Sequence, residues 1–176
     1  MLSTTERLRY DTTAAARQDS FLAGRMVLRG LASQLTGVPP AQVQLIAVCP
    51  DCGGAHGRPE VMGSSLHVSL SHGAGVVVAA ASWDSTIGVD IEAPDERPER
   101  IEAIGELTGH PSIEHWSRVE AVLKADGRGL RVDPSRVSVE EVGGRLMGRV
   151  DDAPVRYDVS EVQLAEGVRV SVAIAA

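Results

Sequence analysis

The sequence is organised around residues 87–92, which read IGVDIE. In an extended strand, the three apolar residues of this stretch share one face and the other three share the opposite face. Asp90 and Glu92 then project together, about 7 Å apart along a strand that rises roughly 3.3 Å per residue. Two carboxylates at that distance repel each other unless a cation lies between them. The stretch therefore predicts a strand whose polar face attracts a cation.

A second stretch, residues 116–127, reads WSRVEAVLKADG and predicts a helix that ends at Gly127. Ser112 can cap this helix at its start. One apolar face is formed by Ile113, Trp116, Val119 and Leu123. Glu120 and Lys124 lie along the margin of that face, one turn apart. Glu120 can therefore reach inward as a third carboxylate, and the set suits a metal ion together with a phosphate.

Each piece alone also has an ordinary explanation. An Asp-x-Glu at a strand end is usually a solvated edge, and a Glu–Lys pair four residues apart usually stabilises a helix surface by a few tenths of a kcal/mol. One feature favours function. Lys124 is the single lysine of the sequence, and every other permanently cationic side chain is arginine. Its ammonium is a point charge on a flexible stem, which a planar guanidinium does not replace.

Residues 88–92 and 116–130 together resemble the signature of the 4′-phosphopantetheinyl transferases, in the surfactin-type branch. The family pattern is Gly-(Val/Ile)-Asp-(Ile/Val)-Glu, followed by Trp-(Ser/Thr)-x-x-Glu-(Ala/Ser)-x-x-Lys-x-x-Gly-x-Gly-Leu, and every position is filled. The resemblance covers roughly residues 19–176. It implies transfer of the phosphopantetheine arm of coenzyme A to a serine of an apo acyl or peptidyl carrier protein, with release of 3′,5′-ADP.

The resemblance also implies roles for the acidic residues and the lysine. Asp90, Glu92 and Glu120 would hold Mg²⁺, a hard cation that prefers oxygen ligands and is often shared with substrate phosphates. Glu120, directly or through a water, is the candidate base for the attacking serine hydroxyl. Lys124 would stabilise the charge that develops on the departing 3′,5′-ADP.

Coenzyme A would be held by residues outside the two main motifs. In the family, a Gly-(Lys/Arg)-Pro turn places a cation against the 3′-phosphate, and residues 57–59 supply Arg58 for that contact. Ser71 and His72 match the Ser-His that the family uses at the phosphate groups. Arg7 stands for the basic residues that precede the first helix in this branch. The connector between residues 92 and 116, which helps to dock the carrier protein in the family, is shorter than is typical.

The remaining pattern predicts an α+β fold. An amphipathic helix is expected from Asp19 or Ser20 to Gly37, and a shorter one over residues 101–108. Strands are expected over residues 43–47, 66–72, 76–81, 87–92, 137–142, 155–162 and 168–174. A turn at residues 84–86 would join two of them in a hairpin, so that residues 66–92 form an antiparallel meander. In the second strand, Leu66, Val68 and Leu70 would face inward and His67 and Ser69 outward, and residues 76–81 would be a buried strand.

The order helix, meander, helix, meander predicts a pseudo-duplicated architecture with two similar halves, each a helix on a small antiparallel sheet. We expect an N-terminal arm or frayed helix over residues 1–18, a first half over 19–95 and a second half over 96–176, in one compact structural unit. The family's fold is similar, with its active site in the cleft between the halves.

Residues 49–56, CPDCGGAH, contain a Cys-x-x-Cys and a nearby histidine that could begin a zinc site. Structural zinc takes four ligands, and the sequence has no second cysteine pair. His67 or His72 could complete the site only if the fold brought one of them there. The other interpretation of this segment is a glycine-rich turn.

Composition limits the classes of function. The chain has 176 residues, 43% of them hydrophobic, and a formal net charge of −7, so a general nucleic-acid surface is not expected. No apolar run reaches the length of a membrane span, and residues 1–19 lack the pattern of a signal peptide. The expectation is a soluble, cytoplasmic monomer that acts away from membranes.

Two rival functions remain open. A non-catalytic module could keep the fold and only bind coenzyme A or a carrier protein, which the short connector favours. A zinc-dependent interaction module could be built on Cys49 and Cys52. The complete set of three carboxylates and one lysine favours catalysis, because a binding module has no need of a metal-bound base.

Overall fold

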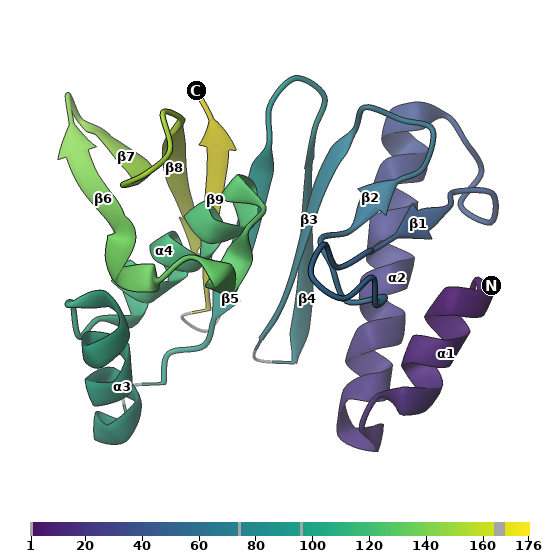
Figure 1. Cartoon of the computed structure of the whole chain (residues 1–176), viewed down its shortest axis with the longest axis horizontal. Helices are drawn as coiled ribbons and strands as arrows, with labels where there is room; N and C mark the ends of the chain where they lie inside the picture. Colours follow the sequence, from purple (N-terminus) through teal and green to yellow (C-terminus); the bar gives the residue numbers. More distant parts are fainter. Residues whose placement is uncertain (1, 74, 96, 164–167) are drawn as a thin grey trace.

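The computed structural model describes residues 2–73, 75–95, 97–163 and 168–176. The fold is α+β, with two antiparallel sheets (Figure 1). The first sheet and its helices comprise α1 (Thr4–Thr12), α2 (Ala15–Thr36), β1 (Leu45–Ile46), β2 (Glu60–Val61), β3 (His67–Gly73) and β4 (Val76–Ser82). The rest of the chain comprises β5 (Ile87–Glu92), α3 (Pro98–Thr108), α4 (Ile113–Asp126), the 3₁₀ turns η1 (Gly129–Arg131) and η2 (Pro134–Arg136), β6 (Val137–Val142), β7 (Arg145–Val150), β8 (Arg156–Gln163) and β9 (Arg169–Ala175).

The first sheet has the strand order β1-β2-β3-β4 and carries α2 on one face. Leu28 and Ala32 of α2 are fully buried against Val68 of β3 and its neighbours. The helix ends at Gly37, as expected, but it begins at Ala15, so the expected start at residue 19 or 20 is wrong. Ala14 precedes it with no side-chain cap, which explains why no capping signal marked the true start.

The N-terminal segment forms a helix of its own, α1. Ser3 and Glu6 form a capping box: the Ser3 hydroxyl accepts from the Glu6 N–H at 3.3 Å, and the Ser3 N–H donates to the Glu6 carboxylate at 2.8 Å. Glu6 is also buried, at 5% exposure. Residues 4–12 are therefore a capped helix that is fixed to the rest of the protein, rather than a loose arm.

The second sheet has the order β5-β9-β8-β7-β6, so the predicted hairpin between residues 76–81 and 87–92 is wrong. β5 pairs along its length with β9, from Ile87 opposite Ile174 to Glu92 opposite Arg169. β7 was not among the predicted strands. The turn after β6 returns the chain directly into it, as the glycines at 143 and 144 allow with their positive φ angles.

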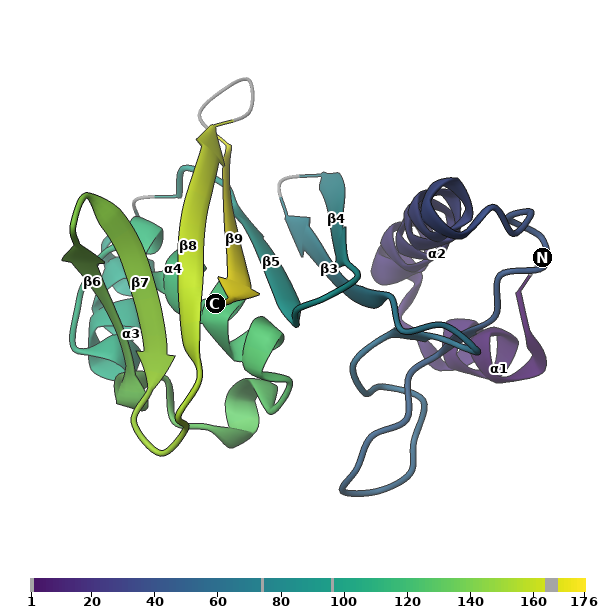
Figure 2. The same ribbon diagram turned by 90° about the horizontal axis from the view of Figure 1, so that it is seen from above.

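The two sheets meet where β3 runs beside β5 (Figure 2). The hydroxyl of Ser69 accepts from the Val89 N–H at 3.0 Å, and the hydroxyl of Ser71 accepts from the Ile91 N–H at 3.3 Å. The two hydroxyls thus bind N–H groups on an edge of β5 that pairs with no strand in the described part of the chain. Ser69, expected to face outward, is therefore buried at 4% exposure.

β4 shows the opposite deviation from prediction. It was expected to be buried throughout, but Val76 is exposed and residues 77–82 are only half-buried. β4 is the edge strand of the first sheet, which leaves its backbone partly open. Its apolar residues still pack on both sides of the strand. Ala79 and Ala81 pack toward α2, and Val78 and Ala80 pack against β5 and β9.

α4 covers the face of the second sheet that points away from β4. A Cβ at Gly88 of β5 would come within 1.9 Å of the Ala121 carbonyl oxygen, so only glycine lets the helix backbone approach the strand this closely. The predicted ends of α4 are confirmed: the Ser112 hydroxyl accepts from the His115 N–H at 3.2 Å, and Gly127 has φ +87°. No helix within the described ranges has both the length and the apolar character needed to cross a membrane.

Candidate functional site

A cavity of about 510 Å³ opens between β3, β5 and α4, next to the start of α3. Six of the residues predicted for the site line it: Ser71, His72, Asp90, Glu92, Glu120 and Lys124. The other two, Arg58 and Arg7, do not. The cavity therefore collects residues from three segments that are up to about 50 positions apart in the sequence.

Lys124 is the hub of the polar contacts in this cavity. Its ammonium donates to Asp90 Oδ1 at 2.7 Å and to Ser71 Oγ at 2.9 Å, and it forms a weaker ion pair with Glu120 at 3.5 Å. The Ser71 hydroxyl in turn donates to Asp90 Oδ1 at 2.9 Å. Asp90 Oδ2 is buried and has no hydrogen-bond partner in the described part of the chain. One acceptor of the site is thus left unpaired.

Glu92 lies at the same end of the cavity and has a different cation. Arg100, from the first turn of α3, forms an ion pair with Glu92 and contacts Asp95 at 3.2 Å. Arg100 was not among the predicted site residues. No motif marks Arg100, because its contact with Glu92 depends on where the connector places α3. Its position in the first turn of the next helix was a weak signal.

The cavity contains more negative charge than its cations neutralise. Burial raises the pKa of Glu120, with Asp90 and Glu92 adding to the rise and Lys124 opposing it. Burial also raises the pKa of Glu92, with Arg100 opposing the rise and Asp90 adding to it. Three carboxylates here face one ammonium and one guanidinium. The arrangement suits an additional cation.

His72 approaches the cavity from the α2 side of β3, opposite to the Ser71 hydroxyl, which faces β5. A Cβ at Gly24 of α2 would lie 3.0 Å from His72 Nε2, so the glycine leaves room for the ring. Burial lowers the pKa of His72, and the charges of Lys124 and Arg25 lower it further. The lowered pKa favours the neutral imidazole, which offers both a donor and an acceptor.

Arg58 holds together two elements of the site instead of lining the cavity. Its guanidinium donates to the carbonyl oxygen of Ala125 at 3.4 Å and to that of Ile87 at 3.3 Å. Ala125 is in the last turn of α4 and Ile87 begins β5, so Arg58 joins the two motif-bearing elements at one end. Burial lowers the pKa of Arg58. A contact with a 3′-phosphate stays a prediction.

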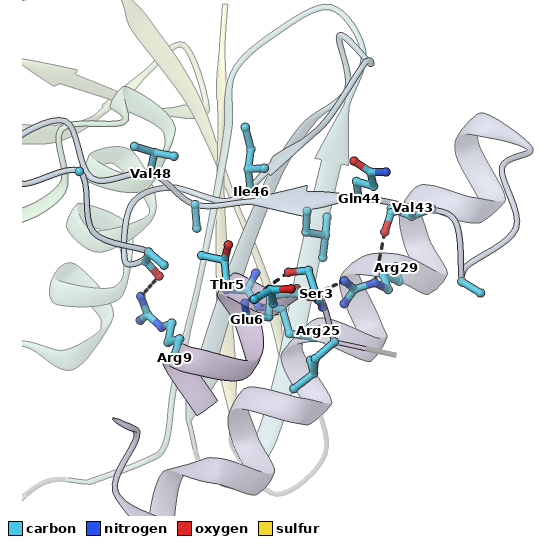
Figure 3. Close-up of a pocket in the computed structure, with 17 residues that line it drawn as sticks. Ser3, Thr5, Glu6, Arg9, Arg25, Arg29, Val43, Gln44, Ile46 and Val48 are labelled. Carbon is cyan, nitrogen blue, oxygen red and sulfur yellow. Dashed lines mark hydrogen bonds and ion pairs between the residues drawn. The ribbon is translucent and has the colours of Figure 1, made fainter. Parts of the chain in front are cut away.

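A second cavity, of about 570 Å³, lies between α1, α2 and β1 (Figure 3). Glu6 forms ion pairs there with Arg29 at 2.6 Å and Arg25 at 3.5 Å. Burial alone would raise the pKa of Glu6, but the Arg29 hydrogen bond, the Ser3 N–H and the two guanidinium charges lower it. Arg7 is exposed on α1 and does not line this cavity.

A third group of chemically reactive residues lies in the loop before β2. The ligand atoms of Cys49, Cys52 and His56 are all within 4.8 Å of one another, and within the described residues no other three metal-ligating side chains meet this condition. The carboxylates of the first cavity do not meet it. Neither His67 nor His72, the possible fourth ligands, belongs to the group.

No protein-family model matches the chain, and a search of curated proteins finds no match either.

Proposed function

We propose that the protein is a Mg²⁺-dependent 4′-phosphopantetheinyl transferase, which moves the phosphopantetheine arm of coenzyme A to a serine of an apo acyl or peptidyl carrier protein and releases 3′,5′-ADP. One observation carries the proposal. Three segments that resemble the family contribute neighbouring side chains to a single cavity: Ser71 and His72, Asp90 and Glu92, and Glu120 and Lys124.

The residues of the cavity fit a divalent cation. The Lys124 ammonium lies between Asp90 and Glu120, 2.7 and 3.5 Å from their carboxylate oxygens. These oxygens therefore already attract positive charge to the cavity. The buried Asp90 Oδ2 has no hydrogen-bond partner in the described part of the chain. Burial, and to a lesser extent the charge of Asp90, raises the pKa values of Glu92 and Glu120, so a nearby cation would favour their ionised forms. Asp90, Glu92 and Glu120 would hold Mg²⁺, which when bound neutralises charge on the coenzyme A diphosphate.

Glu120 is the proposed base. Burial raises its pKa, which brings the proton affinity of the carboxylate closer to that of a base working near neutral pH. It can accept the proton of the carrier serine as that oxygen attacks the β-phosphate of coenzyme A. The bond to the departing 3′,5′-ADP breaks in the same transfer.

Lys124 and His72 are the proposed phosphate contacts. The Lys124 ammonium already reaches from α4 across to Ser71 on β3, so a phosphate in the cavity would be within its range. It would stabilise the negative charge that grows on the leaving group. His72, whose pKa is lowered by burial and by the charges of Lys124 and Arg25, would donate one hydrogen bond to a phosphate oxygen.

We also propose that the two helix-on-sheet units are the similar halves implied by the family resemblance, with the active site in the cleft between them. Two facts support this arrangement. α2 covers one face of the first sheet and α4 one face of the second. The cavity takes residues from β3 of the first sheet and from β5 and α4 of the second unit.

A non-catalytic module that only binds coenzyme A or a carrier protein is the second candidate. It is favoured by the ion pairs that are already present in the site. Lys124 pairs with Asp90, and Arg100 pairs with Glu92. Such a module would bind its ligand but would leave the carrier unmodified.

The deciding experiment is mass spectrometry of several apo carrier proteins after incubation with this protein, coenzyme A and Mg²⁺. We expect at least one carrier to gain the mass of phosphopantetheine, and excess chelator to stop the gain. The Asp90→Ala variant should be inactive while keeping its fold, and Asp84→Ala, at an exposed position in the turn before β5, should be fully active. Binding of coenzyme A without any mass gain would favour the binding module.

A further inference from the structure

The loop between β1 and β2 has a fixed conformation that turns three metal-ligating side chains toward one point. The Cys49 N–H donates to the Gly54 carbonyl at 2.8 Å, and the Gly53 N–H donates to the Cys49 carbonyl at 2.8 Å. Gly53 has φ +71°, a left-handed conformation that glycine adopts without strain. At the base of the loop, the Gly57 N–H donates to the Ala47 carbonyl at 2.9 Å.

Inside this loop the ligand atoms are close to the spacing that zinc requires. Cys52 Sγ lies 3.0 Å from His56 Nε2, and the three ligand atoms all lie within 4.8 Å of one another. In a tetrahedral site with Zn–S bonds of about 2.3 Å and Zn–N bonds of about 2.0 Å, neighbouring ligand atoms are roughly 3.5–3.8 Å apart. Shifts of about 1 Å would therefore bring the three ligands into place.

Other contacts support these ligands. The Gly54 N–H donates to Cys52 Sγ at 3.4 Å, the kind of bond that stabilises a sulfur carrying negative charge. Both cysteines are free thiols. Asp51 Oδ2 lies 3.9 Å from Cys49 Sγ and is available as a fourth ligand, as is a water molecule.

We propose that Cys49, Cys52 and His56 bind a zinc ion that closes this loop. On binding, each thiol forms a bond to the metal and releases its proton to solvent, so two protons leave, and the neutral imidazole binds through Nε2. The site is separate from the cavity between β5 and α4, and its existence does not depend on the proposed transferase activity.

The contacts of the loop show what the zinc would stabilise. Asp51 forms an ion pair with Arg131 of η1 at 3.4 Å, and the Ala55 carbonyl accepts a hydrogen bond from Arg9 of α1. Two residues after His56, Arg58 joins the start of β5 to the end of α4. The metal would therefore fix the segment that links α1, η1 and the two elements that carry the signature motifs.

The test uses the full-length protein, reduced and freed of metal. Zinc titration with a chromogenic chelator as competitor should give one zinc per chain. Cys52→Ser and His56→Ala should weaken binding about 100-fold or more, because each removes one of three protein ligands. The matched control is His110→Ala, an exposed histidine outside the cluster, which should bind zinc like the wild type.

Two further measurements keep the proposal testable if a variant fails to fold. Cobalt(II) added to the reduced wild type should give thiolate charge-transfer absorption and the intense visible bands of a tetrahedral site. Chelator should lower the melting temperature of zinc-loaded wild type but not that of His56→Ala. A reduced wild-type protein that takes up no zinc and shows no cobalt–thiolate band overturns the proposal, as does unchanged zinc affinity in Cys52→Ser.

Discussion

The protein buries two clusters of charged side chains, and their charge balance is opposite. Near α1, the single carboxylate of Glu6 faces Arg25 and Arg29, and its pKa is lowered in spite of burial. Between β5 and α4, three carboxylates face one lysine and one arginine, and the pKa values of Glu92 and Glu120 are raised. The first cluster has more cations than anions, and the second has the reverse.

The difference separates a structural cluster from a functional one. Glu6 accepts hydrogen bonds from the Ser3 N–H and from Arg29 and forms an ion pair with Arg25, which fixes α1 against α2. Both clusters contain buried atoms without a hydrogen-bond partner in the described part of the chain: Glu6 Oε1 and Arg25 Nε in the first, and Asp90 Oδ2 in the second. What distinguishes the second cluster is its excess of carboxylates, whose raised pKa values are typical of sites that bind or react. Variants that change one cluster and leave the other intact test this difference.

The largest expected effect on stability is at Glu6. Glu6→Gln keeps the shape of the side chain but leaves two buried guanidinium groups without a counter-charge. We expect the free energy of unfolding to fall by about 3 kcal/mol, as is typical when one partner of a buried ion pair is removed. Urea unfolding at pH 7 measures this, with the exposed Glu141→Gln as control. Equal stability of the two variants would show that the first cluster does not fix α1.

In the second cluster the expected effect is on turnover. Lys124→Arg should lower turnover about tenfold or more, equivalent to about 1.4 kcal/mol of barrier, because a planar guanidinium places its charge differently from an ammonium. Affinity for coenzyme A should fall less, since the charge that Lys124 meets grows in the transition state. Kinetics of Lys124→Arg beside Lys124→Ala, with thermal melts, measure both effects. Full activity of the arginine variant would remove Lys124 from the mechanism.

Arg58 tests whether a residue that joins β5 to α4 also binds the ligand. Arg58→Ala removes the bridge from Ile87 to Ala125, so stability should fall by about 1–2 kcal/mol. If Arg58 also binds the 3′-phosphate, affinity for coenzyme A should fall more than affinity for dephospho-coenzyme A, which lacks that group. Calorimetry with both ligands decides, and equal losses would leave Arg58 with the structural role alone.

The smallest expected effect is on the stability of the metal-free protein when Glu120 is replaced. This effect has the opposite sign to the effect of replacing Glu6. Because the folded-state pKa of Glu120 is raised, the folded state holds more protons than the unfolded state between the ordinary glutamate pKa and the raised one. Stability therefore falls as pH rises through that window. Glu120→Gln should raise the melting temperature slightly at pH 7, and the gain should disappear in acid.

Glu6 responds to acid in the other direction. Its folded-state pKa is lowered, so its stabilising contribution is present above the ordinary glutamate pKa and is lost as pH falls through the lowered one. Melting curves of the two glutamine variants against pH should therefore diverge on opposite sides of the wild type. A Glu120→Gln variant that melts below the wild type at pH 7 would contradict the charge imbalance.

Local patterns in the sequence predicted the elements of the site better than their partners. The strand at residues 87–92 and the helix that ends at Gly127 are where alternation and capping placed them. The hairpin with β4 was wrong because alternation tells which face of a strand is apolar but not which strand pairs with it. β5 instead pairs with β9, about 80 residues later in the chain.

The residues that the sequence missed depend on contacts between distant segments. Ser69 is polar and was placed outward, yet its hydroxyl replaces a missing strand partner for Val89. Arg100 reaches Glu92 only because of the path of the connector. Arg25 and Arg29, four residues apart on α2, shared a helix face that could have predicted a common anion, but the identity of that anion, Glu6, could not be read from their spacing.

The most direct test of the account asks whether the negatively charged cavity takes up a divalent cation. Mg²⁺ is titrated calorimetrically into the wild type saturated with coenzyme A, and into Asp90→Ala, Glu120→Gln and the control Glu141→Gln. We predict that wild type and control bind Mg²⁺ alike, and that the two cavity variants bind it at least about tenfold more weakly, equivalent to about 1.4 kcal/mol. Equal Mg²⁺ affinity in all four proteins would contradict the account.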